Sequence, residues 1–309
     1  MRLTPRDCNN NSFIHLVTNN LAYSYFSVRT RHFLLSLFLF LGLAQKAEDL
    51  GYDSIWLGDH IVVPWSFESI YPYNTDGTFS VTPRDNILEP LTTLAFLAGC
   101  TRKIKLGIGV MVLPYRHPVY AAKVATTIDY LSDGRFILGV GVGWLEREFD
   151  VLGASFPDRG EVSDEQLQII RKVWDEEKPR FSGRFYNFSE TGFYPKPIQK
   201  PRIPIWVGGN KSGARSRAAM YGDAWYPAIM PVIDPARLSS MFEDVREKAK
   251  QGGRDPGDIS LTSFLNVDLN DPPRIAKEEA ISGDAQQVVD ALRAYQDIGM
   301  KYAVVEVTG

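Results

Sequence analysis

The chain alternates short apolar runs, rich in β-branched and aromatic residues, with longer stretches of helical periodicity, and no Pro/Gly/Ser-rich linker divides them. Most apolar runs are continuous, which is typical of strands in a parallel sheet covered by helices on both faces. The expected strands are 53–57, 104–111, 135–142, 203–207, 223–228, 259–267 and 302–307, with 33–41 as a first strand. The expected helices are 44–50, 90–99, 118–131, 163–174, 212–221, 235–250 and 285–298.

Eight such βα units predict a (β/α)₈ (TIM) barrel, which takes about 250 residues, with a doubly wound open sheet as the alternative. We expect one barrel domain over residues 45–309. In a barrel the active site lies on the loops after the carboxyl ends of the strands. Two of these loops are long, 58–86 and 143–160, and a third excursion at 179–204 includes a small β-hairpin at 181–186. Loops of this length in a compact domain are usually functional.

Residues 1–44 form an atypical leader in which the first strand is expected. The apolar run from Phe33 to Ala44 is shorter than the roughly 20 residues of a membrane span. Arg29 and Arg31 before this apolar run are similar to the positively charged start of a signal peptide, so a signal peptide is the alternative interpretation. Signal peptides start close to the first residue, and cleavage after Ala44 would begin the chain inside the first expected helix. We therefore expect a cytoplasmic protein.

The overall composition excludes several classes of function. Lys and Arg number 34 against 37 Asp and Glu, a formal net charge of −3, so neither nucleic acid nor an anionic membrane is an expected partner. The two cysteines, Cys8 and Cys100, and the four histidines show no metal-ligand spacing. We expect no metal site and no disulfide framework, and the low cysteine content fits a reducing compartment.

The segment from Ile205 to Gly213 (IWVGGNKSG) has the order strand, glycine turn, helix. This arrangement directs free backbone amides and the positive end of a helix dipole at an anion, with Lys211 and Ser212 adding to it. It lacks the spacing of a Walker A loop. The segment is either a phosphate-binding loop or an ordinary glycine-rich turn.

Glycines also recur at the ends of two neighbouring strands. Residues 139–143 read GVGVG, but Trp144 replaces the last glycine of a dinucleotide fingerprint, so the run does not predict a Rossmann fold. Small residues at a barrel strand end either admit a flat ring against the backbone or fit crowded layers of side chains. Gly107 and Gly109 on the preceding strand allow the same two interpretations.

The pair Asp59-His60 directly follows the strand at 53–57, where a barrel presents catalytic side chains. A histidine there either exchanges a proton with a substrate, hydrogen-bonds a ring, or serves the structure alone. His117, before Pro118, is interpreted mainly as a helix-entry residue. The charged residues 146–148 are interpreted as a solvated face.

Four segments together resemble the luciferase-like monooxygenase superfamily, specifically its F420-dependent oxidoreductases. They read AEDLGYDSIWLGDHIVVP, LEPLTTLAFLAG, TRKIKLGIGVMVLPYRHPVYAAKVATTIDYLSDGRFILGVGVGW and PKPIQKPRIPIWVGGNKSGARSRAAMYGDAWYP. The resemblance extends over residues 45–309, whereas the leader does not match the short first strand usual in that family.

The resemblance implies a barrel that binds the deazaflavin coenzyme F420, with FMN as the alternative cofactor. It assigns His60 to catalysis, and it assigns Asp59, Trp65 and Trp144 to the substrate pocket. It implies a non-proline cis peptide at Gly109-Val110. The residues implied for cofactor binding are Gly109, Val110, Gly141, Gly143, Gly208, Gly209, Asn210, Lys211 and Ser212. Trp144 stands where relatives that oxidise sugar phosphates have a glutamate, so we do not expect that reaction here.

We therefore expect an oxidoreductase that transfers a hydride between C5 of the deazaflavin and a small organic substrate. An FMN-dependent monooxygenase is the alternative within enzymes, and a non-catalytic flavin- or deazaflavin-binding barrel is the alternative outside them. The resemblance also makes a homodimer possible.

Overall fold

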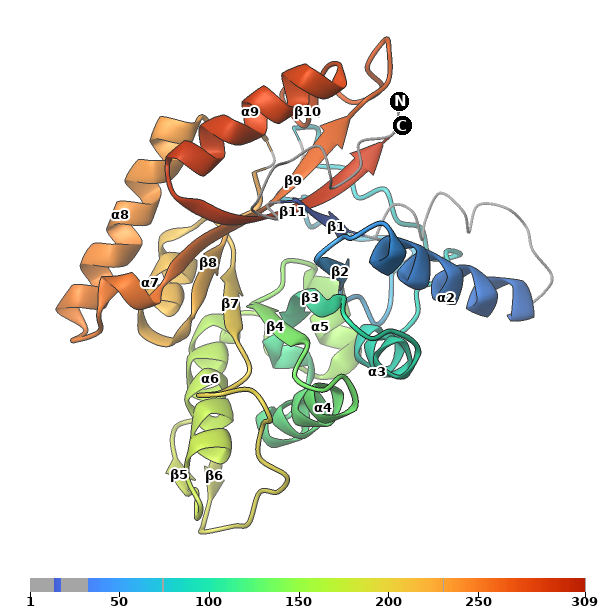
Figure 1. The fold of residues 1–309 in the computed structure, drawn as a ribbon. Coiled ribbons are helices and arrows are strands. Elements are labelled where there is room, and N and C mark those ends of the chain that lie inside the picture. Colours follow the sequence, from blue (N-terminus) through green and yellow to red (C-terminus); the bar gives the residue numbers. More distant parts are fainter. Residues whose placement is uncertain (1–13, 18–32, 74, 230, 309) are drawn as a thin grey trace.

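Eight parallel strands close into a barrel in the computed structural model, which describes residues 14–17, 33–73, 75–229 and 231–308 (Figure 1). Around the ring they are β1 (Ile14–Val17), β2 (Ser54–Leu57), β3 (Lys105–Val112), β4 (Phe136–Gly141), β7 (Ile205–Gly208), β8 (Ala224–Tyr226), β9 (Ser260–Asp268) and β11 (Met300–Thr308). The ring closes because β11 pairs with β1 and β8 pairs with β9. The short β10 (Ile281–Ser282) continues alongside the end of β9. The predicted (β/α)₈ barrel is confirmed.

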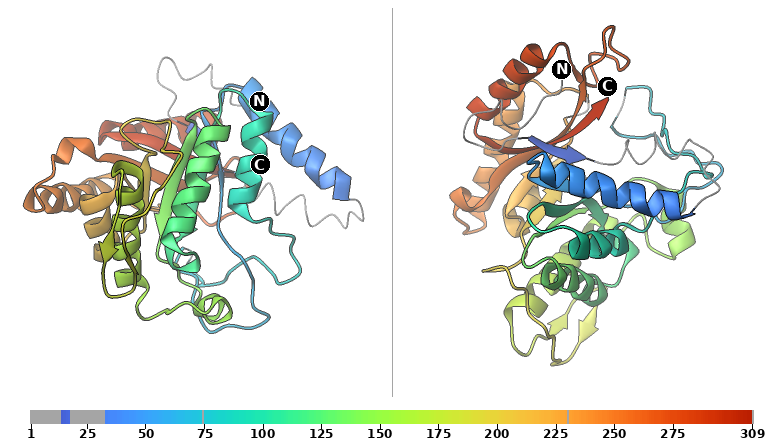
Figure 2. Two further views of the ribbon diagram at one scale, coloured as in Figure 1. Left: turned by 90° about the horizontal axis from the view of Figure 1, so that it is seen from below. Right: turned by 45° about the vertical axis from the view of Figure 1, so that its right-hand side comes forward.

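Helices surround the barrel on its outside (Figures 1 and 2). They include α3 (Pro90–Cys100), α4 (Pro118–Leu131), α6 (Arg159–Asp175), α7 (Ser212–Tyr221), α8 (Pro235–Gln251) and α9 (Ala285–Asp297). The shorter η2 (Leu113–Tyr115) and α5 (Glu146–Leu152) follow the carboxyl ends of β3 and β4, and η3 (Pro256–Asp258) precedes β9. The helix predicted to start at Ser163 begins four residues earlier. The Ser163 hydroxyl donates to the Arg159 carbonyl inside that helix instead of capping it.

The prediction of a strand at 33–41 is wrong, because these residues begin a continuous helix, α2 (Phe33–Asp49), beside α3 (Figure 2). The first barrel strand is β1, earlier in the chain. A continuous apolar run does not by itself distinguish a strand from a buried helix. The run 33–41 contains only Phe, Leu and Ser, with no β-branched residue, and leucine favours helices.

Large aromatic side chains fill the barrel interior opposite glycines. Trp56 on β2 stacks on Trp206 at 4.8 Å between ring centroids and on Tyr226 at 5.4 Å. Trp56 is in register with Gly107, and Trp206 with Gly139. A Cβ at Gly107 would lie 2.4 Å from the Trp56 ring, so only glycine fits there. Crowding inside the barrel therefore explains Gly107.

The excursion at 179–204 contains the predicted hairpin, formed by β5 (Phe181–Ser182) and β6 (Asn187–Phe188). The Glu165 carboxylate on α6 accepts hydrogen bonds from the amides of Arg184, Phe185 and Tyr186, and so holds the turn of the hairpin against α6.

None of the described helices combines the length and the apolar character that crossing a bilayer requires.

Candidate active site

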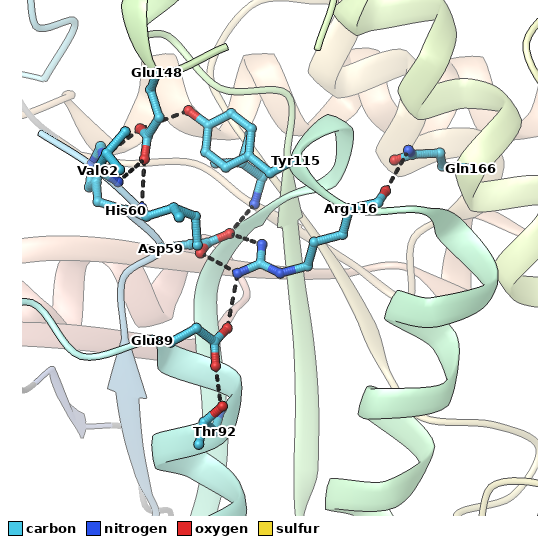
Figure 3. A network of polar contacts seen from close by, with 11 residues as sticks. Asp59, His60, Val62, Glu89, Thr92, Tyr115, Arg116, Glu148 and Gln166 are labelled. Atoms are coloured by element: carbon cyan, nitrogen blue, oxygen red, sulfur yellow. Dashed lines mark hydrogen bonds and ion pairs between the residues drawn. The ribbon is translucent and has the colours of Figure 1, made fainter. Parts of the chain in front are cut away.

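His60 lies at the carboxyl end of β2, where a buried glutamate from a different part of the chain holds it (Figure 3). Oε2 of Glu148, on α5, lies 2.9 Å from His60 Nδ1, within hydrogen-bond distance. Its Oε1 accepts the backbone amides of Ile61 at 2.6 Å and Val62 at 3.1 Å. The Tyr115 hydroxyl donates to Oε2 at 2.8 Å. One carboxylate thus fixes both the His60 ring and the backbone that follows it.

The interpretation of residues 146–148 as a solvated face is wrong for Glu148, which is fully buried. The sequence did hold a signal, because Leu145, Glu148, Phe149 and Leu152 have the spacing of one helical face and three of them are apolar. Burial acts to raise the pKa of Glu148, but the hydrogen bonds from His60 and from the Val62 and Ile61 amides outweigh it and lower that pKa. Glu148 is therefore an ionised acceptor at neutral pH.

Asp59, predicted to line the substrate pocket, is bound by the largely buried side chain of Arg116. Its Oδ2 accepts a hydrogen bond from Arg116 Nη1 at 2.6 Å, and its Oδ1 accepts one from Arg116 Nη2 at 2.8 Å. Oδ2 also accepts a hydrogen bond from the Val112 amide at 2.8 Å. Arg116 Nη2 further donates to Glu89 Oε1 at 3.0 Å (Figure 3). Asp59 is 4% exposed, and through these contacts its carboxylate positions the end of β2. No local pattern in the sequence marks Arg116 or Glu89 as members of this group.

Aromatic rings from the loop after β2 enclose His60 together with Trp144, which follows β4. Phe79 lies 4.9 Å from the His60 ring and 5.1 Å from Trp144 between centroids. Tyr71 and Phe67 also contact Trp144. Trp65 lies apart from this group, 72% exposed and beneath the Arg84 guanidinium. The structure thus brings Trp144 to His60 but not Trp65.

Val110 lies in the barrel interior between the ends of β4 and β7. A Cβ added at Gly141 would lie 2.5 Å from a Val110 methyl, and one at Gly208 would lie 2.7 Å from the other. The peptide bond between Gly109 and Val110 is cis. The predicted ring-contact residues Gly109, Val110 and Gly141 are therefore grouped around one side chain at the barrel mouth, while Gly143 follows with a φ of 80°.

The turn from β7 into α7 is shaped by its own backbone and side chains. The Asn210 side chain makes two hydrogen bonds with the Ala228 backbone. Its Nδ2 donates to the Ala228 carbonyl at 2.8 Å, and its Oδ1 accepts from the Ala228 amide at 3.1 Å. Gly209 has a φ of 111°, a conformation that favours glycine. Lys211 is the N-cap of α7 and makes no side-chain cap hydrogen bond. Lys211 and Ser212 are exposed at the helix N-terminus, where a phosphate oxygen could be bound.

The family model described as luciferase-like monooxygenase matches residues 37–281 of this chain. The chain belongs to this family. Among relatives of the luciferase-like monooxygenase fold, an F420-dependent glucose-6-phosphate dehydrogenase of Kineococcus radiotolerans is 25% identical over 86% of each chain. An FMNH₂-dependent dimethylsulfone monooxygenase of Pseudomonas putida is 30% identical, over 67% of this chain and 59% of that protein.

A solved structure supports the same fold for this luciferase-like chain. An F420-dependent secondary alcohol dehydrogenase, solved with an F420-acetone adduct, superposes with a TM-score of 0.74. It is 17% identical, and the match covers 96% of this chain and 94% of that one. The family and these neighbours are oxidoreductases and monooxygenases that use either F420 or FMN, so this chain is an enzyme of the luciferase-like oxidoreductase class.

Proposed function

We propose that this protein is an F420-dependent oxidoreductase that transfers a hydride between C5 of the deazaflavin and a small organic substrate at the barrel mouth. The observation that carries the proposal is His60, whose ring is fixed through Nδ1 and whose Nε2 has no hydrogen-bond partner among the described residues. Similarity to F420-dependent relatives supports this choice of cofactor.

The residues at the mouth fit a deazaflavin. The α7 N-terminus offers backbone amides with no side-chain cap, together with the exposed Lys211 and Ser212, for a phosphate. Asn210 would shape this loop rather than bind, because its amide is paired with Ala228. We assign Gly208 and Gly209 to the same loop, and Gly109, Val110, Gly141 and Gly143 to the ring. When bound, the deazaflavin supplies the hydride chemistry at its C5 position.

The protein side chains handle the proton and the shape of the pocket. His60 Nε2 would exchange a proton with the substrate oxygen, which is the role of a general acid or base. Trp144 and Phe79 would exclude water from the reacting atoms. The rings of Trp144 and Phe79 beside His60 give this part of the pocket apolar walls, so we propose an uncharged carbonyl compound or alcohol rather than a sugar phosphate.

A turnover assay tests this proposal. Reduced F420 is mixed anaerobically with a panel of ketones, aldehydes and enones, and the oxidised deazaflavin is followed by its absorbance. We expect turnover that falls about 100-fold or more in His60→Ala, the usual range for a lost general acid or base. The matched control is His117→Ala, because His117 is exposed and its ring lies edge-on to the Tyr186 ring, away from Glu148.

The second candidate is an FMN-dependent monooxygenase, which the similarity to the dimethylsulfone monooxygenase favours. The same assay with FMNH₂ and oxygen, scored by substrate oxygenation, addresses it. Oxygenation with FMNH₂ and no reaction with reduced F420 would overturn the F420 proposal. Cofactor binding without turnover of any compound would instead support a non-catalytic barrel.

A further inference from the structure

Glu148 accepts four hydrogen bonds from the described residues, and each of its two oxygens accepts a different kind. Oε1 accepts only backbone amides, those of Ile61 and Val62. Both hydrogen bonds to Oε2 come from side chains, His60 Nδ1 at 2.9 Å and the Tyr115 hydroxyl at 2.8 Å. The first pair fixes the backbone after β2, and the second pair acts on the imidazole ring itself. Figure 3 shows both pairs converging on the one carboxylate.

The protonation of this group determines the direction of its hydrogen bonds. An ionised carboxylate only accepts hydrogen bonds. The Ile61 and Val62 amides can only donate to Glu148, which favours its ionised form independently of His60. Burial together with the Glu148 charge raises the pKa of Tyr115, which remains a donor. His60 Nδ1 must therefore carry a hydrogen. In the neutral ring the lone pair then lies on Nε2, since only one of the two ring nitrogens is protonated.

We propose that Glu148 is a positioning residue that fixes His60 in the tautomer with hydrogen on Nδ1, so that Nε2 acts as the base that takes the proton of a substrate hydroxyl. This inference rests on the proposed function. In the oxidation direction the substrate O–H bond would break and its proton would pass to Nε2, as the C=O bond forms. The hydride on the carbon that bears this oxygen would leave to oxidised F420, the chemistry that the bound deazaflavin would supply. Glu148 then stabilises the imidazolium that forms.

The variant Glu148→Gln separates this role from a merely structural one. A glutamine whose Oε1 keeps the Ile61 and Val62 amide bonds places its NH₂ group where Oε2 was. That group donates to His60 Nδ1, so the ring hydrogen moves to Nε2 and the lone pair facing the substrate is lost. We expect kcat for alcohol oxidation with oxidised F420 to fall about 100-fold or more, as for a lost general base, with KM within a few-fold of wild type.

The matched control is Glu146→Gln, the same change at an exposed position on the same helix, which should leave the rate and tautomer unchanged. The tautomer is read directly from the ¹⁵N shifts of the histidine rings, with the His60 signals assigned by their loss in His60→Ala. We expect hydrogen on Nδ1 in wild type and on Nε2 in Glu148→Gln.

Hydrogen on Nε2 in neutral wild-type His60 would overturn the proposal even if the variant failed to fold. A tautomer exchange in Glu148→Gln without loss of kcat would also overturn it, while leaving the F420 function intact. The proposed function fails in a different way, by absence of turnover with reduced F420 in the wild-type enzyme, and the tautomer measurement does not depend on that result.

Discussion

Replacing Arg116 by methionine should destabilise the fold strongly, because it leaves the Asp59 carboxylate buried without its charged partner. The Arg116 and Asp59 side chains are 10% and 0% exposed, and two hydrogen bonds of 2.6 and 2.8 Å join them. In the variant, the amide of Val112 is the one hydrogen-bond donor from the described part of the chain that Asp59 keeps. Removing one partner of a buried ion pair costs about 3–5 kcal/mol. We therefore expect the free energy of unfolding to fall by that amount.

Urea unfolding followed by tryptophan fluorescence measures this loss. The matched control is Arg147→Met, because the ion pair of Arg147 with Asp150 joins side chains that are 64% and 54% exposed. Such exposed pairs contribute about 0–1 kcal/mol. The double variant Asp59→Asn with Arg116→Met should lose less than the sum of the single variants, since the residues are in direct contact. A loss below about 1 kcal/mol in Arg116→Met would refute the reasoning, since it equals that of an exposed pair.

Three further predictions follow from other contacts. Gly107→Ala should lower the free energy of unfolding by about 1–3 kcal/mol, because its Cβ would lie 2.4 Å from the Trp56 ring. Gly42→Ala should not be destabilising, because the space around Gly42 is open. Equal effects of the two substitutions would contradict the packing account. Burial acts to raise the pKa of Asp268, but hydrogen bonds from the amides of Asn270, Ile275 and Arg274 outweigh it and lower that pKa to about 2. The contribution of Asp268 to stability should therefore be lost as the pH falls from about 4 towards 2, and in acid unfolding Asp268→Asn should remove that loss. Glu279→Ala should speed proteolytic cleavage in the loop after β2, because Glu279 Oε1 accepts the Thr75 amide at 2.7 Å and hydroxyl at 2.5 Å; unchanged cleavage would show that this contact does not hold the loop.

The barrel was predictable because its strands carry local signals. Continuous apolar runs bounded by glycine and helix starts identify strands in a parallel sheet whatever their partners are. The run at 33–41 was mispredicted because its composition, not its hydrophobicity, specifies a helix. The interior glycines were predictable as special positions, but their neighbours were not. Gly107 faces Trp56 and Gly141 faces Val110, contacts that depend on the register of adjacent strands.

The candidate site was only partly predictable. His60 could be found because it follows a strand end, a position that the barrel itself makes functional. Its two supporting contacts lie far away in sequence: Glu148 is 88 residues from His60, and Arg116 is 57 residues from Asp59. No local pattern encodes such pairs. The helical spacing of Glu148 with apolar residues indicates burial, but it does not indicate which group the carboxylate meets.

The most direct test of the central claim is a parallel equilibrium titration of the purified protein with F420 and FMN, each oxidised and reduced, followed by cofactor fluorescence. The account predicts tight binding of F420, weak binding of FMN, and loss of F420 affinity when Lys211 and Ser212 are both replaced by alanine. Tight binding of FMN with weak binding of F420, or binding of neither cofactor, would contradict it.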